Sequence, residues 1–176
     1  MGTLLLLGLF PRWLDQFRAW DSGSMHPRAG LLLVASPGSG DRNFAKTVVL
    51  LVKVGPEGAT GLVLNRPRPP GDEALREGAD RWGGPVWPAF LSTLSRSQTS
   101  MPGAWRILEG LFWNEGPAPE GLSTEGSLTF AGLSVWGPGQ LDSELERGGW
   151  VLMETGTEAV FSDTSALWAE CIAPHG

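Results

Sequence analysis

The sequence predicts an α+β domain in which strands dominate. Gly and Pro supply 25 and 14 of the 176 residues, so turns are frequent and helices short. The apolar runs 31–35 and 47–52 are typical of strands buried on both faces. Because strand patterns come first and helices are inserted irregularly, the order favours α+β over a doubly wound parallel sheet.

The pattern of apolar residues and turn signals locates the individual elements. The turn residues 55–58 indicate a hairpin between the second and third strands, and Gly148 with Gly149 stops a helix. Asp163 or Thr164 is expected to cap the terminal helix, residues 151–153 form a short strand, and 86–94 and 105–113 stay ambiguous between strand and helix. We expect strands near 30–36, 46–54, 60–65, 128–135 and 158–162, and helices near 72–78, 140–147 and 164–171.

Residues 1–24 differ from the domain expected at 28–173. An amphipathic helix is predicted from about residue 11 to 20, with an apolar face of Trp13, Leu14, Phe17 and Trp20. A Gly-Ser linker then precedes Met25, which indicates an N-terminal extension or an appended peptide, engineered or native. A docked peptide, a membrane-surface helix and an extra core helix stay open, although balanced charges disfavour the membrane. We expect its apolar face to be buried against a groove of this chain or a neighbouring copy.

Composition excludes several classes of function. The single cysteine, Cys171, excludes an internal disulfide and a multi-cysteine zinc site, and it fits a reducing, cytoplasmic location. The only histidines, His26 and His175, lie near the edges of the domain, so neither a catalytic imidazole nor a metal site is predicted. Basic residues are scattered before position 107 and only Arg147 follows, which argues against direct binding of nucleic acid. No segment is suited to export or to spanning a membrane.

Four local motifs have more ordinary structural explanations. The stretch 40–47 misses the phosphate-binding loop pattern at Ala45 and leads into a strand pattern instead of a helix. The stretch 132–137 carries Trp136 where a serine nucleophile elbow needs glycine. The acids at 142, 144 and 146 fall on different faces of a helix, which indicates a solvated surface. Cys171, among apolar neighbours, is expected to be buried and inert.

Three Gly-rich segments give the strongest candidate site. They are residues 58–67, 83–86 and 136–141, and each places glycine beside a polar or aromatic group. Two interpretations of these segments stay open. The glycines either allow tight backbone packing at sheet corners, or they belong to turns that converge on one shallow pocket or protein-binding face. The residues that would form such a site are Asn65, Gly83, Gly84, Pro85, Trp136, Gly139 and Gln140.

The same segments resemble the YqgE/AlgH family of bacterial proteins from about residue 30 to 171. The matching stretches are 35–37 with Asp41 and Phe44, 47–49, 58–67, 83–86, 130–132, 136–141, Glu144 with Leu145, Trp150, Phe161 and Trp168. The resemblance implies a mixed, bifurcated sheet folded into a pseudo-barrel with peripheral helices. It implies no defined chemistry, since the family is largely uncharacterised. Its occasional label as a transcriptional regulator comes from effects on alginate production and not from a DNA-binding motif. The stretch 87–93 departs from the family pattern, which usually ends this strand in Leu-His.

We therefore expect a non-catalytic interaction or regulatory protein without a cofactor. Its partner is expected to be a protein or an amphipathic peptide, because no nucleophile with a base, no metal set and no cofactor loop is evident. The alternative is a small-molecule-binding protein or weak enzyme that uses the Gly-rich turns, with Asn65, Trp136 and Gln140 as contacts. A concave pocket shared by those three side chains would favour the alternative.

Overall fold

A computed structural model describes residues 25–67, 78–117, 120–121 and 126–173. Within these ranges the chain forms nine strands and three helices, and the helices have only five to seven residues. The strands are β1 (Leu32–Ala35), β2 (Val48–Gly55), β3 (Gly58–Val63), β4 (Arg81–Trp82), β5 (Val86–Arg96), β6 (Trp105–Leu108), β7 (Leu111–Glu115), β8 (Ser127–Trp136) and β9 (Trp150–Met153), and the helices are α1 (Gln140–Glu146), α2 (Thr157–Phe161) and α3 (Leu167–Ile172).

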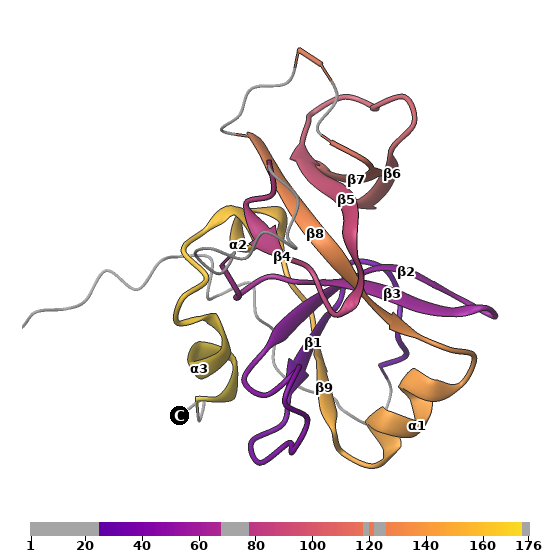
Figure 1. Cartoon of the computed structure of the whole chain (residues 1–176), viewed down its shortest axis with the longest axis vertical. Coiled ribbons are helices and arrows are strands. Elements are labelled where there is room, and N and C mark those ends of the chain that lie inside the picture. Colours follow the sequence, from indigo (N-terminus) through magenta and orange to yellow (C-terminus); the bar gives the residue numbers. More distant parts are fainter. Residues whose placement is uncertain (1–24, 68–77, 118–119, 122–125, 174–176) are drawn as a thin grey trace, which may run out of the picture.

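The strands form one sheet in the order β6-β7-β5-β8-β3-β2-β1-β9. Neighbouring strands on this path are antiparallel, and β4 adds a parallel pairing to β8. The sheet bends at β8, which pairs with β5 along one part and with β3 along another (Figure 1). This open, mixed sheet with helices at its periphery confirms the α+β prediction.

Two apolar clusters lie on opposite faces of β1 and β2. Leu32, Val34 and Leu50 face the first cluster, with Phe130 of β8 and Leu167 of α3. Leu31, Leu33 and Val49 face the second, to which α1 contributes Leu141. The continuous apolar runs therefore do form strands buried on both faces, as expected from their lack of alternation.

The predicted strand at 158–162 is wrong, because this segment forms helix α2. An Ala-Val-Phe triplet is too short to show a period, and here a turn decides: the amide of Ala159 donates to the carbonyl of Gly156 at 3.2 Å. The side chain of Thr157 anchors the helix to the β6–β7 turn through the Glu109 carbonyl, 2.7 Å away. Tertiary contacts thus outweigh the β-propensity of the triplet.

The predicted cap of the terminal helix is also wrong. Ala166 precedes α3, whereas Thr164 is buried and donates to the carbonyl of Leu64 at 2.9 Å. Asp163 accepts instead from the amide of Ser165 in a local turn. The ambiguous stretches 86–94 and 105–113 belong to β5, β6 and β7. The helix predicted at 72–78 falls almost wholly outside the described residues, as does the predicted helix at 11–20.

A close crossing of glycines joins the start of β5 to β8. A Cβ at Gly83 would lie 2.3 Å from the carbonyl oxygen of Gly132, and a Cβ at Gly84 would lie 2.3 Å from the backbone of Leu133. Gly132 has a φ of +76°, and a Cβ added there would lie 2.3 Å from the carbonyl oxygen of Gly84. Backbone hydrogen bonds from Gly83 to Ala131 and from Val63 to Gly83 complete the crossing. Only residues without a side chain permit this approach.

Gly132→Ala should therefore lower the free energy of unfolding by about 3 kcal/mol or more, from left-handed backbone strain and overpacking together. Gly38→Ala is the matched control, because Gly38 has a φ of +85° but a Cβ added there would have no heavy atom within 4 Å. It should lose only about 1–2 kcal/mol. Urea unfolding measures both, and equal losses would show that the crossing tolerates a methyl group.

Candidate functional site

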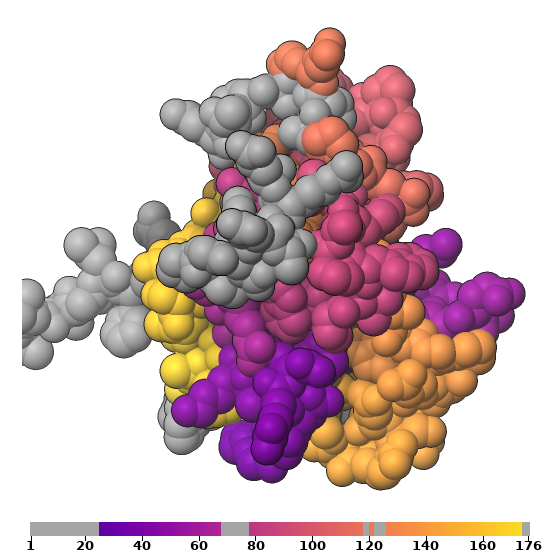
Figure 2. Space-filling view, in the orientation of Figure 1, coloured from indigo at the N-terminus to yellow at the C-terminus, as the bar shows by residue number. Residues whose placement is uncertain are grey.

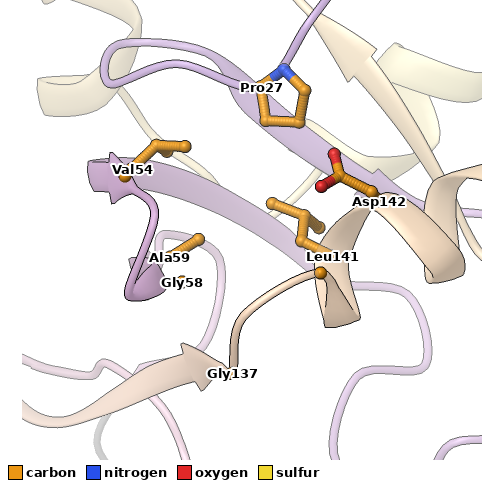
Figure 3. Close-up of a pocket in the computed structure, with 9 residues that line it drawn as sticks. Pro27, Val54, Gly58, Ala59, Gly137, Leu141 and Asp142 are labelled. Atoms are coloured by element: carbon orange, nitrogen blue, oxygen red, sulfur yellow. The ribbon is translucent and has the colours of Figure 1, made fainter.

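Two of the three Gly-rich turns meet at one hollow in the surface (Figure 3). Gly55 and Gly58 of the β2–β3 hairpin form one side, and Gly137 with Gly139 before α1 forms another. The hollow encloses about 40 Å³, room for a few waters or one side chain. Metabolite pockets typically enclose roughly 300–1,000 Å³, so this hollow is too small for one. The third turn, at Gly83 and Gly84, lies at the glycine crossing instead.

A carboxylate ties the neighbouring elements together. Glu144 of α1 accepts hydrogen bonds from the indole nitrogens of Trp136 and Trp150, at 2.9 and 2.8 Å. Its other oxygen accepts from the side-chain amide of Gln140 at 2.9 Å, and the Gln140 carbonyl oxygen accepts from the amide of Gly137 at 3.0 Å. Trp136 and Gln140 thus hold the loop and helix together, and neither lines the hollow.

Aromatic rings close over this carboxylate. Phe44, from the loop before β2, stacks on Trp136 with ring centroids 6.0 Å apart and meets Trp150 edge-on at 5.4 Å. The two indoles are themselves perpendicular at 5.9 Å. Trp136 and Trp150 are only 2% and 7% exposed. Because the rings contact one another directly, no ligand fits between them.

The hydrogen bonds set the charge state of Glu144. Burial by itself would raise the pKa of this carboxyl, but the bonds from Gln140, Trp150 and Trp136, with the charge of Arg147, outweigh it and lower the pKa. The carboxylate is therefore ionised at neutral pH. A general acid or base needs a pKa near the working pH, so Glu144 is suited to structure and not to proton transfer.

Asn65 also bonds to the backbone. Its side-chain oxygen accepts from the amide of Val48 at 2.9 Å, and its nitrogen donates to the carbonyl of Lys46 at 2.9 Å. It thereby fixes the sharp turn at Lys46, whose φ is +57°. The structure does not bring Asn65 into contact with the hollow. Asn65, Trp136 and Gln140, the residues expected to contact a small molecule in the alternative function, are thus each hydrogen-bonded within the protein.

The residues of the catalytic motifs considered in the sequence also have structural roles. The stretch 40–47 enters strand β2, and the hydroxyl of Ser134 is buried and donates to the carbonyl of Gly83 at 3.1 Å. Burial, followed by the charge of Glu170, raises the pKa of the Cys171 thiol to about 12. Among the described residues, no group of three His, Cys, Asp or Glu could hold a metal ion. No helix in the described ranges is long and apolar enough to cross a membrane.

The most exposed large apolar side chain described is one that the site prediction did not include. Trp87 is 65% exposed and lies in β5 directly after Pro85 and Val86, of which Pro85 was a predicted site residue. Residues 87–90 form a bulge, because Val86 pairs with Leu133 while Leu91 pairs with Ala131, only two positions away. The proline within the apolar run 86–91 was the available sequence signal, since proline in a strand indicates a bulge.

Comparisons with known proteins identify the family. A family model described as AlgH-like matches residues 32–176. The chain belongs to the AlgH-like family. This result confirms the resemblance to the YqgE/AlgH proteins.

Relatives support the same assignment over most of their length. AlgH-like relatives named UPF0301 protein include one from Paracoccus denitrificans, 33% identical over 84% of this chain and 89% of the relative. Another, from Streptomyces avermitilis, is 39% identical over 81% and 84%. The solution structure of AlgH from Pseudomonas aeruginosa is 27% identical with a TM-score of 0.63, covering 85% of this chain and 93% of that one.

A crystal structure from Corynebacterium diphtheriae shows the same fold. It has a TM-score of 0.66 at 24% identity and covers 83% of this chain and 86% of its own. The names of these AlgH-like relatives state no activity. The function therefore has to be argued from the geometry of this chain.

Glu144→Gln should lower the free energy of unfolding at pH 7 by about 1–2 kcal/mol, because an amide nitrogen would face indole donors. A carboxyl whose folded pKa is lowered stabilises the fold above its unfolded pKa and loses this effect as pH falls below it. Wild-type stability should therefore drop below the ordinary glutamate pKa of 4.5, and the variant should drop less. Glu146→Gln, exposed on the same helix, is the control; matching pH profiles for wild type and Glu144→Gln would contradict the prediction.

The raised pKa of Cys171 predicts slow alkylation of the folded protein. At pH 8 the buried thiol is protonated, and only the thiolate reacts with iodoacetamide. Labelling followed by mass spectrometry should show at least tenfold slower modification in buffer than in denaturant. Equal rates would mean that the thiol is exposed and ionised.

Proposed function

We propose that this chain is a non-catalytic interaction protein that binds a segment of a partner protein at the β5 bulge. The observation that carries the proposal is Trp87, 65% exposed on a bulge of the central sheet. Large aromatic side chains dominate the binding energy of protein interfaces, whereas folding gains little from an exposed one. Among the described aromatic rings, that of Phe90 lies near Trp87, with centroids 6.3 Å apart.

The backbone holds Trp87 in place. Its φ of +48° is unusual for a bulky residue and costs on the order of 1–3 kcal/mol. Pairing of Val86 with Leu133 on one side and of Leu91 with Ala131 on the other fixes both ends of the bulge. Pro88 removes further freedom between them. A side chain displayed in this way loses little entropy when a partner binds.

The surface beside the bulge indicates the chemistry of the partner. Phe90 packs against the first apolar cluster, and the same sheet face continues to Val135, which is 40% exposed. Val135 pairs with Thr60, which pairs with the exposed Lys53, so a strip of four strands ends in a positive charge. Figure 2 shows magenta β5 and the purple β2–β3 hairpin on the same visible face. The strip fits a segment with a large apolar anchor and an acidic residue.

The described residues support the alternative less. Asn65, Trp136 and Gln140 bond to the protein itself, and the hollow beside α1 holds about 40 Å³. The same proposal places the protein in the cytoplasm and includes no direct contact with nucleic acid. Residues 1–24, with Trp13, Leu14, Phe17 and Trp20, stay a second candidate occupant of an apolar surface.

Selection of a displayed random-peptide library on the full chain tests the proposal. Selected peptides should carry an aromatic or large aliphatic residue near an acid. Trp87→Ser should weaken their binding at least tenfold in fluorescence polarisation, and Lys53→Gln a few-fold with a smaller salt dependence. Trp105→Ser, at another exposed tryptophan, is the control and should have no effect.

Three outcomes would contradict the proposal. They are an absence of selected peptides, equal binding by Trp87→Ser, and stabilisation by a metabolite that Gln140→Ala abolishes. A synthetic peptide of residues 1–24 is a further arm. If that peptide binds and depends on Trp87, the occupant is the chain's own segment and the choice of a partner protein is wrong.

A further inference from the structure

The hollow beside α1 has walls that cannot be filled from within. A Cβ at Gly58 would lie 2.1 Å from the carbonyl oxygen of Trp136, so this wall stays bare backbone. Val54, Ala59 and Leu141 supply apolar surface, and Pro27 closes the opposite side (Figure 3). At about 40 Å³ the space suits a short aliphatic stem.

Of the described residues that line the hollow, Asp142 is the one that carries a charge. Figure 3 places its carboxylate at the rim, between Pro27 and the side chain of Leu141. Among the described residues its carboxylate forms no hydrogen bond or ion pair within the distances that define them. The rim therefore offers a negative charge above an apolar floor.

Among the described residues, the neighbouring charged side chains named here do not pair with this carboxylate. Arg28, next to Pro27, pairs with Glu154 at 3.0 Å, and the Nε of Arg147 donates to the carbonyl of Ser143 at 3.0 Å. Glu146, one turn along α1, adds a second negative charge, and Lys53 belongs to the opposite face of the hairpin. An acid in the first turn also stabilises a helix, but that role needs no hollow beneath it.

We propose that the hollow binds a primary alkylammonium group on a short aliphatic stem. The methylenes would lie against Val54, Ala59 and Leu141, and the ammonium would donate to Asp142 at the rim. Two sources carry this chemistry, a lysine side chain of a peptide and a free polyamine. The site is independent of the β5 bulge, because it lies on the other face of the β2–β3 hairpin.

Titration of the ¹⁵N-labelled full chain with n-butylammonium chloride tests the site. Amide shifts should concentrate at Gly55, Ala59, Gly139 and Leu141 and saturate with a Kd on the order of millimolar. n-Butanol, the neutral probe of similar shape, should bind at least threefold more weakly. Capped lysine and spermidine are compared next, and the tighter of the two identifies the source.

Three variants separate the contribution of the Asp142 charge to binding from that of the shape of the hollow. Asp142→Asn should weaken butylammonium about fivefold and leave butanol unchanged, while Glu146→Gln, on the same helix outside the hollow, should change neither. Gly55→Val should weaken binding of both, since Gly55 lines the hollow and a Cβ there meets no heavy atom within 4 Å, so the added side chain fits without disturbing the fold. Three results would overturn the proposal: equal affinity for the two probes, an affinity of Asp142→Asn for butylammonium equal to that of the wild type, or amide shifts that never saturate. None of these results bears on Trp87, so failure here leaves the proposed function standing.

Discussion

The close approach of Gly83 and Gly84 to Gly132 is the constraint on which the sheet depends. It brings the start of β5 onto β8 at the position where β8 turns from β5 toward β3. The strands on either side can then enclose the first apolar cluster, with α2 and α3 at its end. Because the crossing leaves four residues of β5 opposite one glycine, the same contact also produces the exposed bulge.

Glu144 performs a comparable task on the other face. One carboxylate accepts from two indoles and a side-chain amide, so β8, α1 and β9 are held by charged hydrogen bonds within a single small cluster. A half-buried carboxylate beside aromatic rings suggests chemistry at first sight. Here the three side-chain donors that reach it are residues of the fold itself, and the hydrogen-bonded carboxylate stays ionised. The cluster stabilises the fold and leaves binding to the surface.

The sequence predicted best where a local pattern matched the tertiary structure. The runs forming β1 and β2 have no alternation because both faces are buried, and Gly148 with Gly149 ended α1 as expected. The strand prediction for residues 158–162 was wrong because a contact from Thr157 to Glu109, distant in sequence, favours a helix. The glycines were recognised as special, but which of them pack together depends on strand register. Trp87 was missed because its exposure follows from the same register.

In the proposed function, Trp87 is displayed by a rigid, strained bulge and not by a flexible loop. NMR relaxation of the backbone amides of Val86, Trp87, Ala89 and Phe90 tests it most directly, since Pro88 has no amide proton. We expect order parameters of about 0.85, equal to those of the flanking strand residues. Values below about 0.6 at these positions would show a mobile loop and contradict a preformed binding surface.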